Sequence, residues 1–345
     1  MSWAEIKKAV NSNLDVPLNE QLERLEVVEI NGKRCKVIRN YRIDPVKTLL
    51  SVHSANMAVG IRDNIMYQIN STVIHINNVT NKSSNYWSED ENIKSNYSSY
   101  THAIVVNDKY IYIMGGGYNS ASGSPNGRMY DFDSKINKTI TNPIRSSGSW
   151  AYHTMVEFNG NVFVLGGNLY AEMNNTMTNF KNTNIRLNLD SEGDYVSATV
   201  MNDLPMNFAN PSSVVFDNEI RLFNGINQYK SNDGSTWTFV SSSGFNINYN
   251  KAVVYNDEIH AFYETKHYKS SDGITWTQLD DTPFSIQTDD SVFVAHRKIY
   301  VLGSRDDNKG FNAYKDGQWL AGGSILVESG VTFEPFDGSE TIKLP

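Results

Sequence analysis

One pattern of apolar and polar positions recurs six times along the chain. Each copy has a β-rich apolar stretch, a two-residue polar turn and a second apolar stretch that often ends in glycine or a small polar residue. The copies are Met57 to Ile69, His102 to Gly116, His153 to Gly167, Ser213 to Gly225, Ala252 to Tyr263 and Val292 to Gly303. Their turns lie at Arg62-Asp63, Asn107-Asp108, Asn159-Gly160, Asp217-Asn218, Asn256-Asp257 and His296-Arg297. Successive turns are 45, 52, 58, 39 and 40 residues apart, which brackets the repeat length of β-propeller blades.

The strands of these hairpins are nearly continuous apolar runs, such as Val162-Phe163-Val164-Leu165. A strand with one face in solvent alternates apolar and polar residues, so continuous runs indicate burial on both faces. Sheets stacked around an axis provide that burial, because each sheet covers the apolar hairpins of its neighbours. The pattern therefore predicts an all-β, six-bladed β-propeller.

Two glycine pairs, Gly115-Gly116 and Gly166-Gly167, close the second strands of the second and third copies. A positive φ or a close backbone approach favours glycine at such positions. The order of apolar strand, polar turn, apolar strand and Gly-Gly resembles the kelch repeat, which implies a kelch-like propeller. The other copies depart from the pattern, because Gly225 and Gly303 stand alone and the first and fifth copies have no glycine there.

Two ten-residue segments, Tyr229 to Thr238 and Tyr268 to Thr277, are near copies, and Tyr314 to Trp319 is a looser third. They resemble the Asp-box turns of sialidase-type propellers, shortened by one residue. Asp-Gly supplies the left-handed backbone that a tight turn requires, while Trp237 and Trp276 are expected to pack between blades. We predict that these segments connect the third and fourth strands of their blades.

The first 48 residues are predicted to form an attachment segment outside the propeller, which spans residues 49–322. Ser2 and Glu5 form a capping box that begins a short helix, and a hairpin is expected around Asn31-Gly32. The candidate attachment contacts are Trp3, Ile6, Val10, Leu14, Leu18 and Leu22. An alternative is that the leucines fold back on the wall of the propeller.

The opening from Ser2 to Asn19 resembles the first residues of tail-fibre and baseplate-associated proteins of phages and phage-tail-like particles in low-GC Gram-positive bacteria. This resemblance implies a protein of the virion tail, assembled in the bacterial cytoplasm, whose N-terminal segment binds other tail or baseplate proteins. A homo-oligomer is compatible with such a setting. Residues 323–345 form a strand-like tail that either closes the ring or docks beside the N-terminal hairpin.

Charge and cysteine content narrow the classes of partner. The net charge of -8 provides no basic surface for nucleic-acid phosphates. Cys35 is the single cysteine, so the chain forms no internal disulfide and no thiolate cluster. A charged start and the lack of an 18-residue apolar run predict neither a signal peptide nor membrane insertion.

Catalytic arrangements are weakly represented. A sialidase uses three clustered arginines, whereas the arginines here fall in separate turns, strands and loops, namely Arg62, Arg128, Arg145, Arg221, Arg297 and Arg305. The carboxylate pairs that a two-carboxylate glycosidase requires are expected to be solvated turn residues, namely Asp131 and Asp133, Asp289 and Asp290, and Asp306 and Asp307. The copper chemistry of some kelch-like rings needs a Cys-Tyr crosslink, and Cys35 precedes the ring.

No metal site or cofactor is predicted. His102 and His153 precede inner strands and are expected to be hydrogen-bonded there, or else to line the central mouth. No spacing offers three or more ligands, and Asp190 to Asp194 is expected to be a hairpin turn rather than a calcium loop. We therefore expect no enzymatic activity.

The loops of the second and third blades are long, which predicts one elaborated rim. Aromatic rings stack on sugars while amides bind sugar hydroxyls, so these loops are expected to bind a glycan or receptor on the host surface. The candidate ligand-binding residues are Tyr100, Tyr118, Asn119, Trp150, Tyr152, Tyr170 and Asn174. Two alternatives are a purely structural tail component and a sialidase-like hydrolase.

Overall fold

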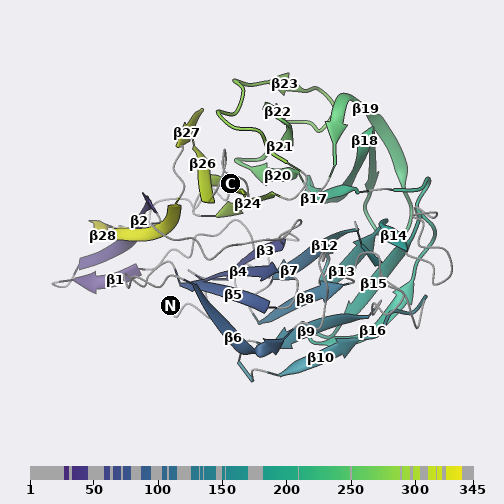
Figure 1. Ribbon diagram of the computed structural model, residues 1–345, viewed down its shortest axis with the longest axis horizontal. Helices are drawn as coiled ribbons and strands as arrows, with labels where there is room; N and C mark the ends of the chain where they lie inside the picture. Colours follow the sequence, from purple (N-terminus) through teal and green to yellow (C-terminus); the bar gives the residue numbers. More distant parts are fainter. Residues whose placement is uncertain are drawn as a thin grey trace.

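The structure is a computed structural model that describes residues 27–45 except 31–32, the strands between residues 58 and 114, residues 126–320 apart from 170–181 and short gaps, and residues 324–335. The regular structure in these residues consists of 28 β-strands, with no helix among them. The strands form several small antiparallel sheets (Figure 1). The fold is therefore all-β and propeller-like, which confirms the predicted fold class at that level.

Six sheets follow one another along the chain. The first contains β3 (Ala58–Arg62), β4 (Ile65–Asn70), β5 (Val73–Asn78) and β6 (Trp87–Lys94). The second contains β7 (Ala103–Val106), β8 (Tyr110–Met114), β9 (Gly127–Asp131) and β10 (Asn137–Ile140). The third contains β12 (Thr154–Phe158), β13 (Asn161–Leu165), β15 (Asn184–Leu189) and β16 (Tyr195–Val200).

The other three sheets continue this order. The fourth contains β17 (Ser212–Phe216), β18 (Glu219–Ser231) and β19 (Thr238–Ile247). The fifth contains β20 (Ala252–Tyr255), β21 (Glu258–Tyr263), β22 (Lys266–Ser270) and β23 (Thr277–Gln278). The sixth contains β24 (Ser291–Ala295), β25 (Lys298–Gly303), β26 (Gly310–Lys315) and β27 (Gln318–Leu320). A separate short pair joins β11 (Trp150–Ala151) to β14 (Asn168–Leu169).

The first strands of the six sheets contact one another in cyclic order. β3 lies against β7, β7 against β12, β12 against β17, β17 against β20, β20 against β24, and β24 against β3. Figure 1 shows the sheets following one another around this centre. The sixth sheet packs against the first without sharing a strand with it in the described part of the chain.

Local turn chemistry sets the hairpins that begin three of the sheets. Asn159-Gly160, Asp217-Asn218 and Asn256-Asp257 all have positive φ, between 49° and 68°. Two consecutive residues with positive φ define the type I′ turn, which asparagine, aspartate and glycine tolerate best. The three turns fall where the sequence predicts them.

The long strand β18 turns back on itself within the fourth sheet. Lys230 Nζ lies 2.9 Å from Glu219 Oε1, although eleven residues in a straight strand would separate them by about 35 Å. Gly225, with a φ of 61°, lies between the two halves. The same ion pair, Lys269 to Glu258 at 2.9 Å, joins the separate strands β22 and β21 of the fifth sheet. The fourth sheet thus follows the plan of the four-stranded sheets.

Apolar side chains fill the spaces between neighbouring sheets. All five residues of β8 are buried, as are four of the five residues of β13. On one face of β13, Val162 and Val164 belong to a cluster with Tyr112 of β8. On the other face, Phe163 belongs to a cluster with Leu222 of β18. Burial on both faces, inferred from the continuous apolar runs, is confirmed here.

A three-stranded sheet formed by the two ends of the chain lies beside the ring. It contains β1 (Val27–Ile30), β2 (Lys33–Pro45) and β28 (Ser324–Pro335). The hairpin predicted around Asn31-Gly32 is present as β1 and β2. β28 pairs with β2 from Cys35↔Pro335 to Pro45↔Ser324, so the C-terminal strand docks beside the N-terminal hairpin instead of closing the ring.

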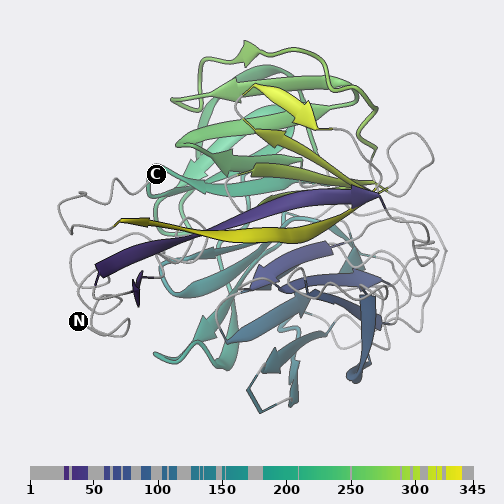
Figure 2. The same cartoon turned by 90° about the vertical axis from the view of Figure 1, so that its left-hand side faces the viewer.

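The predicted N-terminal helix lies outside the described residues. The same holds for all six candidate attachment contacts, namely Trp3, Ile6, Val10, Leu14, Leu18 and Leu22. Figure 2, which faces the terminal sheet, shows β2 in purple and β28 in yellow running side by side.

Candidate functional site

The aromatic rim predicted from the sequence falls almost wholly outside the described residues. Six of its seven members lie there, namely Tyr100, Tyr118, Asn119, Tyr152, Tyr170 and Asn174. The seventh, Trp150, is completely buried. Its indole Nε1 donates a hydrogen bond to the carbonyl oxygen of Gly166 at 3.1 Å, and its ring lies 4.8 Å from that of His153.

The prediction that Trp150 contacts a ligand is therefore wrong. The tryptophan is part of the apolar cluster between the second and third sheets. Its neighbours in sequence, Ser149 and Ala151, give no sign of a core position. The signal that it belongs to the core is the contact with Gly166, which is sixteen residues away and whose positive φ of 70° turns the chain at the end of β13.

Polar side chains link the starts of the innermost strands. Thr154 Oγ1 and Ser213 Oγ are 2.7 Å apart and connect the third sheet to the fourth. Ser212 Oγ accepts a hydrogen bond from the amide of Ala252 at 3.0 Å and connects the fourth to the fifth. Lys251 Nζ donates to the carbonyl oxygen of Asp290 and connects the fifth to the sixth. These contacts tie sheet to sheet around the centre.

His153 belongs to the same level of the ring but is held by packing. Only 1% of its surface is exposed, and neither ring nitrogen makes a hydrogen bond of normal geometry. Burial lowers its pKa to about 3, and the nearby backbone of Met114 only partly opposes that shift. The structural role expected for His153 is confirmed, but packing provides it: this imidazole is a neutral core residue whose ring is tilted by 33° against that of Trp150.

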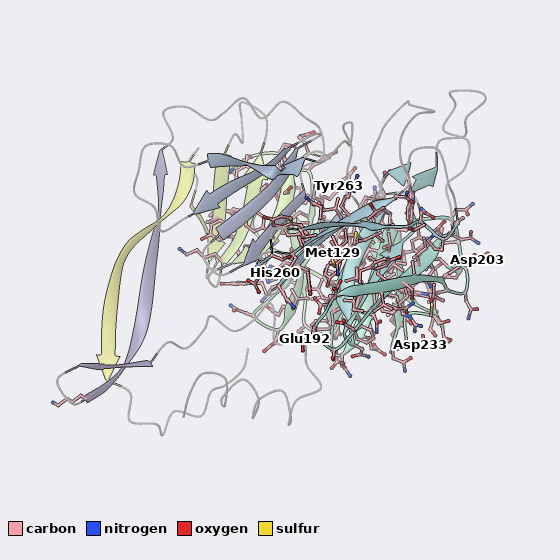
Figure 3. All side chains as sticks on the ribbon, turned by 90° about the horizontal axis from the view of Figure 1, so that it is seen from below. Met129, Glu192, Asp203, Asp233, His260 and Tyr263 are labelled. Atoms are coloured by element: carbon pink, nitrogen blue, oxygen red, sulfur yellow. The ribbon has the colours of Figure 1, made fainter. Side chains whose placement is uncertain are left out.

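The fifth sheet buries two histidines in contact with each other. His260 Nδ1 and His267 Nε2 are 2.8 Å apart on the neighbouring strands β21 and β22, and the side chains are 2% and 0% exposed. Figure 3 labels His260 among the packed sheets. Burial lowers the pKa of His260 to about 4, with a smaller contribution from Lys269. Burial and then the charge of His260 lower the pKa of His267 to about 3.

Aromatic rings from two sheets surround the histidine pair. Phe262 stacks on His267 at 4.4 Å, and Tyr314 of the sixth sheet meets the same ring edge-on at 4.6 Å. Tyr255 lies 5.5 Å from His260. We define His260, His267 and these three rings as the histidine cluster. Its residues fill the space between two sheets, so its geometry is that of a core.

The sequence analysis did not predict the histidine cluster. The repeat does indicate these positions, because equivalent positions of the fourth sheet also carry polar residues. Arg221 and Gln228 stand 39 positions before His260 and His267. Both are also buried, at 5% and 0% exposure. This comparison identifies a pair of interior polar positions in each sheet, but not the contact between them.

The two Asp-Gly turns are built alike. Asp233 Oδ1 accepts hydrogen bonds from the amides of Ser235 and Thr236, each at 2.7 Å. Asp272 Oδ1 accepts from Ile274 and Thr275, also at 2.7 Å. The predicted position between third and fourth strands is confirmed in the fifth sheet, where this turn joins β22 to β23.

Hydrogen bonding fixes the charge of both aspartates. Partial burial acts to raise the pKa of Asp233, but the amides of Thr236 and Ser235 outweigh it and the pKa is lowered to about 2. The amides of Ile274 and Thr275 lower the pKa of Asp272 to about 2. Each carboxylate is therefore ionised and accepts hydrogen bonds from amides of its own turn.

Each of these turns rests on the preceding sheet. A Cβ atom added at Gly234 would lie 2.1 Å from Cε1 of Phe163 in the third sheet, and one added at Gly273 would lie 3.2 Å from Nη1 of Arg221 in the fourth. Trp237 packs against the cluster between the third and fourth sheets, as expected for a tryptophan between blades. The turns therefore lock neighbouring sheets together.

The candidate hydrolase residues in the described part of the chain have structural partners. Arg221 Nη2 lies 3.1 Å from Glu219 Oε2, whereas Arg128 Nη1 donates to Thr139 Oγ1 at 2.9 Å in another sheet. Asp131 Oδ1 accepts from the amides of Asp133 and Ser134 within its own turn. Arg62, Arg145, Arg297, Arg305, Asp289, Asp306, Asp307 and His102 have no described side chain.

Asp190 to Asp194 is a hairpin turn between β15 and β16, as predicted. Asp190 Oδ1 accepts hydrogen bonds from the amides of Glu192 and Asp194, both at 2.9 Å. A search of the described side chains for three or more histidine, cysteine, aspartate or glutamate residues that could hold a metal ion found none. Within the described residues, no helix is long and apolar enough to span a membrane.

The comparisons with known proteins found similarity in the fold alone. No protein-family model and no curated protein matches the chain. Among solved structures, the one titled "Structure of YjhT" is similar, with a TM-score of 0.57 and 11% sequence identity. The match covers 85% of this chain and 99% of that one. Similarity at this level of identity supports the propeller-like, all-β fold reached from the sheet order.

Proposed function

We propose that this chain is a non-catalytic binding protein of a phage tail or phage-tail-like particle. In this proposal the six sheets are the blades of a six-bladed kelch-like propeller, whose long rim loops bind a glycan or receptor on the host surface. The observation that carries the proposal is the cyclic contact of the six innermost strands, because a ring of this kind gathers its connecting loops on shared faces. The tail setting rests on the resemblance of Ser2 to Asn19.

A binding role is favoured over hydrolysis by the positions of the charged side chains. Arg221 is buried beside Glu219, and Asp233 and Asp272 each hold a turn. A sialidase-like site would need such groups free to meet a substrate. The second candidate, a purely structural tail component, is favoured by the terminal sheet, which joins both ends of the chain beside the ring.

A binding experiment separates adhesin from structural component. The wild-type protein is expected to bind host cell walls or a bacterial glycan array, and the double variant Tyr118→Ala/Tyr170→Ala is expected to lose that binding. Tyr263→Ala is the matched control, because this tyrosine is 39% exposed at the end of β21 and outside the predicted rim. Trp150→Ala is unsuitable, because it would open a cavity in the core.

The outcomes assign the function. Unchanged binding by the double variant, combined with particles that fail to assemble without the protein, would favour the structural role. Release of sugar from bacterial surface glycans by the wild-type protein would contradict the non-catalytic proposal.

A further inference from the structure

The sheet formed by the chain ends is long and narrow. β2 and β28 pair over eleven residues, whereas β1 pairs only with Lys33 to Lys36 of β2. A 13-residue strand is about 40 Å long, and Figure 3 shows β2 and β28 standing beside the ring with β1 at one end. Over most of its length this sheet is therefore a two-stranded ribbon.

Neither edge of the ribbon has a hydrogen-bonded neighbour strand within the described part of the chain. β28 is an outer strand of its sheet and lies against β26 of the sixth sheet without pairing with it, and Val37 to Pro45 of β2 have no strand on the side away from β28. A two-stranded ribbon is marginally stable in water, and long edges without protection attract further strands. Prolines, which protect an edge, stand only at the strand ends, as Pro45 and Pro335, so the protection of β2 comes from its basic residues, which repel another basic strand but not an acidic one.

The two open edges have opposite charge. β2 carries more basic than acidic residues, namely Lys33, Arg34, Lys36, Arg39 and Arg42 against Asp44. β28 carries Glu328 and Glu334 and no basic residue. The pairing within the chain already uses this difference, because Glu29 of β1 lies opposite Arg34 and Glu334 of β28 lies opposite Lys36. β2 thus pairs with an acidic residue on both of its sides.

We propose that copies of this chain associate through this sheet, with the free edge of β28 in one copy adding to the free edge of β2 in the next. Opposite charges on facing strands stabilise such pairing. The twelve residues of β28 are long enough to cover Val37 to Pro45, where Arg39 and Arg42 lack a strand on their open side. The added strand turns the two-stranded part of the ribbon into a wider sheet.

The geometry of this contact sets the kind of assembly. The joined edges are different, so the contact is heterologous, and a closed ring of heterologous contacts contains at least three copies. Pairing of two β2 edges is less favourable, because it places basic strands against each other. The inference does not depend on what the rim loops bind.

The mass of the full-length protein in solution tests the proposal. Light scattering after size-exclusion chromatography is expected to give three or more copies. Arg39→Glu/Arg42→Glu and Glu328→Lys, each alone, place like charges on the joined edges and are expected to weaken association at least about tenfold. The control Lys138→Glu/Lys266→Glu makes the same charge change as the double variant at half-exposed ring positions and is expected to keep the wild-type mass.

Mixing the two edge variants separates association from folding defects. In a mixture, the altered β2, which has become acidic, adds to the altered β28, which has gained a lysine, and the unaltered edges pair as in the wild type. The mixture is therefore expected to form oligomers although each variant alone does not. A monomeric wild-type protein at micromolar concentration, edge variants with wild-type mass, or a mixture that stays monomeric would each overturn the proposal.

Discussion

The histidine cluster predicts that acid weakens the fold in a defined pH range. His260 and His267 have folded-state pKa values of about 4 and about 3, below the ordinary value of 6.5. The unfolded chain therefore binds more protons than the folded chain between those values, and stability falls as the pH drops through 6.5. At pH 5 the unfolded chain binds a proton at each of these histidines and the folded chain does not, which lowers the free energy of unfolding by about 2 kcal/mol per histidine. The pair therefore lowers it by about 4 kcal/mol relative to pH 7.

The charge of Lys269 is part of this effect. Lys269 lies close enough to lower both pKa values, while Tyr255 and Tyr314 present uncharged rings at these pH values. A proton on either imidazole would place a cation among aromatic rings and next to the other histidine. The buried pair is therefore expected to stay neutral until the sheets separate.

Urea unfolding at pH 7 and pH 5 measures the effect. Between pH 7 and pH 5, the free energy of unfolding of the double variant His260→Leu/His267→Leu is expected to fall by about 4 kcal/mol less than that of the wild type. Gln228→Leu is the matched control, since it changes the buried position equivalent to His267 without removing a titrating group. Equal pH dependence in the wild type and the double variant would refute the assignment of acid sensitivity to this pair.

Two further predictions concern the Asp-Gly turns. Gly234→Ala is expected to lower the free energy of unfolding by about 1–2 kcal/mol because of the positive φ, and by a further 1–3 kcal/mol, roughly, because the new methyl group overlaps Phe163. Gly160→Ala is the control, since Gly160 has a similar φ and no atom within 4 Å of the added Cβ, so only the first loss is expected. Equal losses of stability in thermal unfolding would contradict this. Asp233→Ala and Asp272→Ala are each expected to cost about 0.5–1.5 kcal/mol at pH 7, because exposed turn amides lose their acceptor and bind water instead. Since both folded-state pKa values are about 2, this contribution is present above pH 4 and is lost as the pH falls through 2, so urea midpoints of wild type and variants should converge in acid.

Much of the fold could be predicted because its determinants are local. Pairs such as Asn256-Asp257 adopt positive φ at low cost, so turn chemistry identifies the hairpin before its partners are known. Continuous apolar runs indicate burial on both faces wherever they occur. Asp233 and its 39-residue copy indicate the outer turns in the same way, since each carboxylate bonds to amides two and three residues ahead.

The features that could not be predicted depend on distant contacts. From the sequence, Trp150 resembles an exposed loop residue. Its buried position depends on a contact sixteen residues away, where the carbonyl oxygen of Gly166 lies 3.1 Å from its indole nitrogen. His260 and His267 meet because of the register between β21 and β22, and they are buried because the sixth sheet covers them. The partner of β28 was equally undetermined, because alternating apolar residues suit a ring strand and an outer ribbon alike.

The pairing of β2 with β28 means that two backbones, not one, join the ring to the far end of the terminal sheet. A domain on a single extended tether swivels about its bonds, whereas a hydrogen-bonded pair of strands resists torsion. The paired strands therefore resist rotation of the ring relative to β1. The register shifts between Asn40 and Tyr41, and a bulge of this kind is where a paired ribbon is expected to bend.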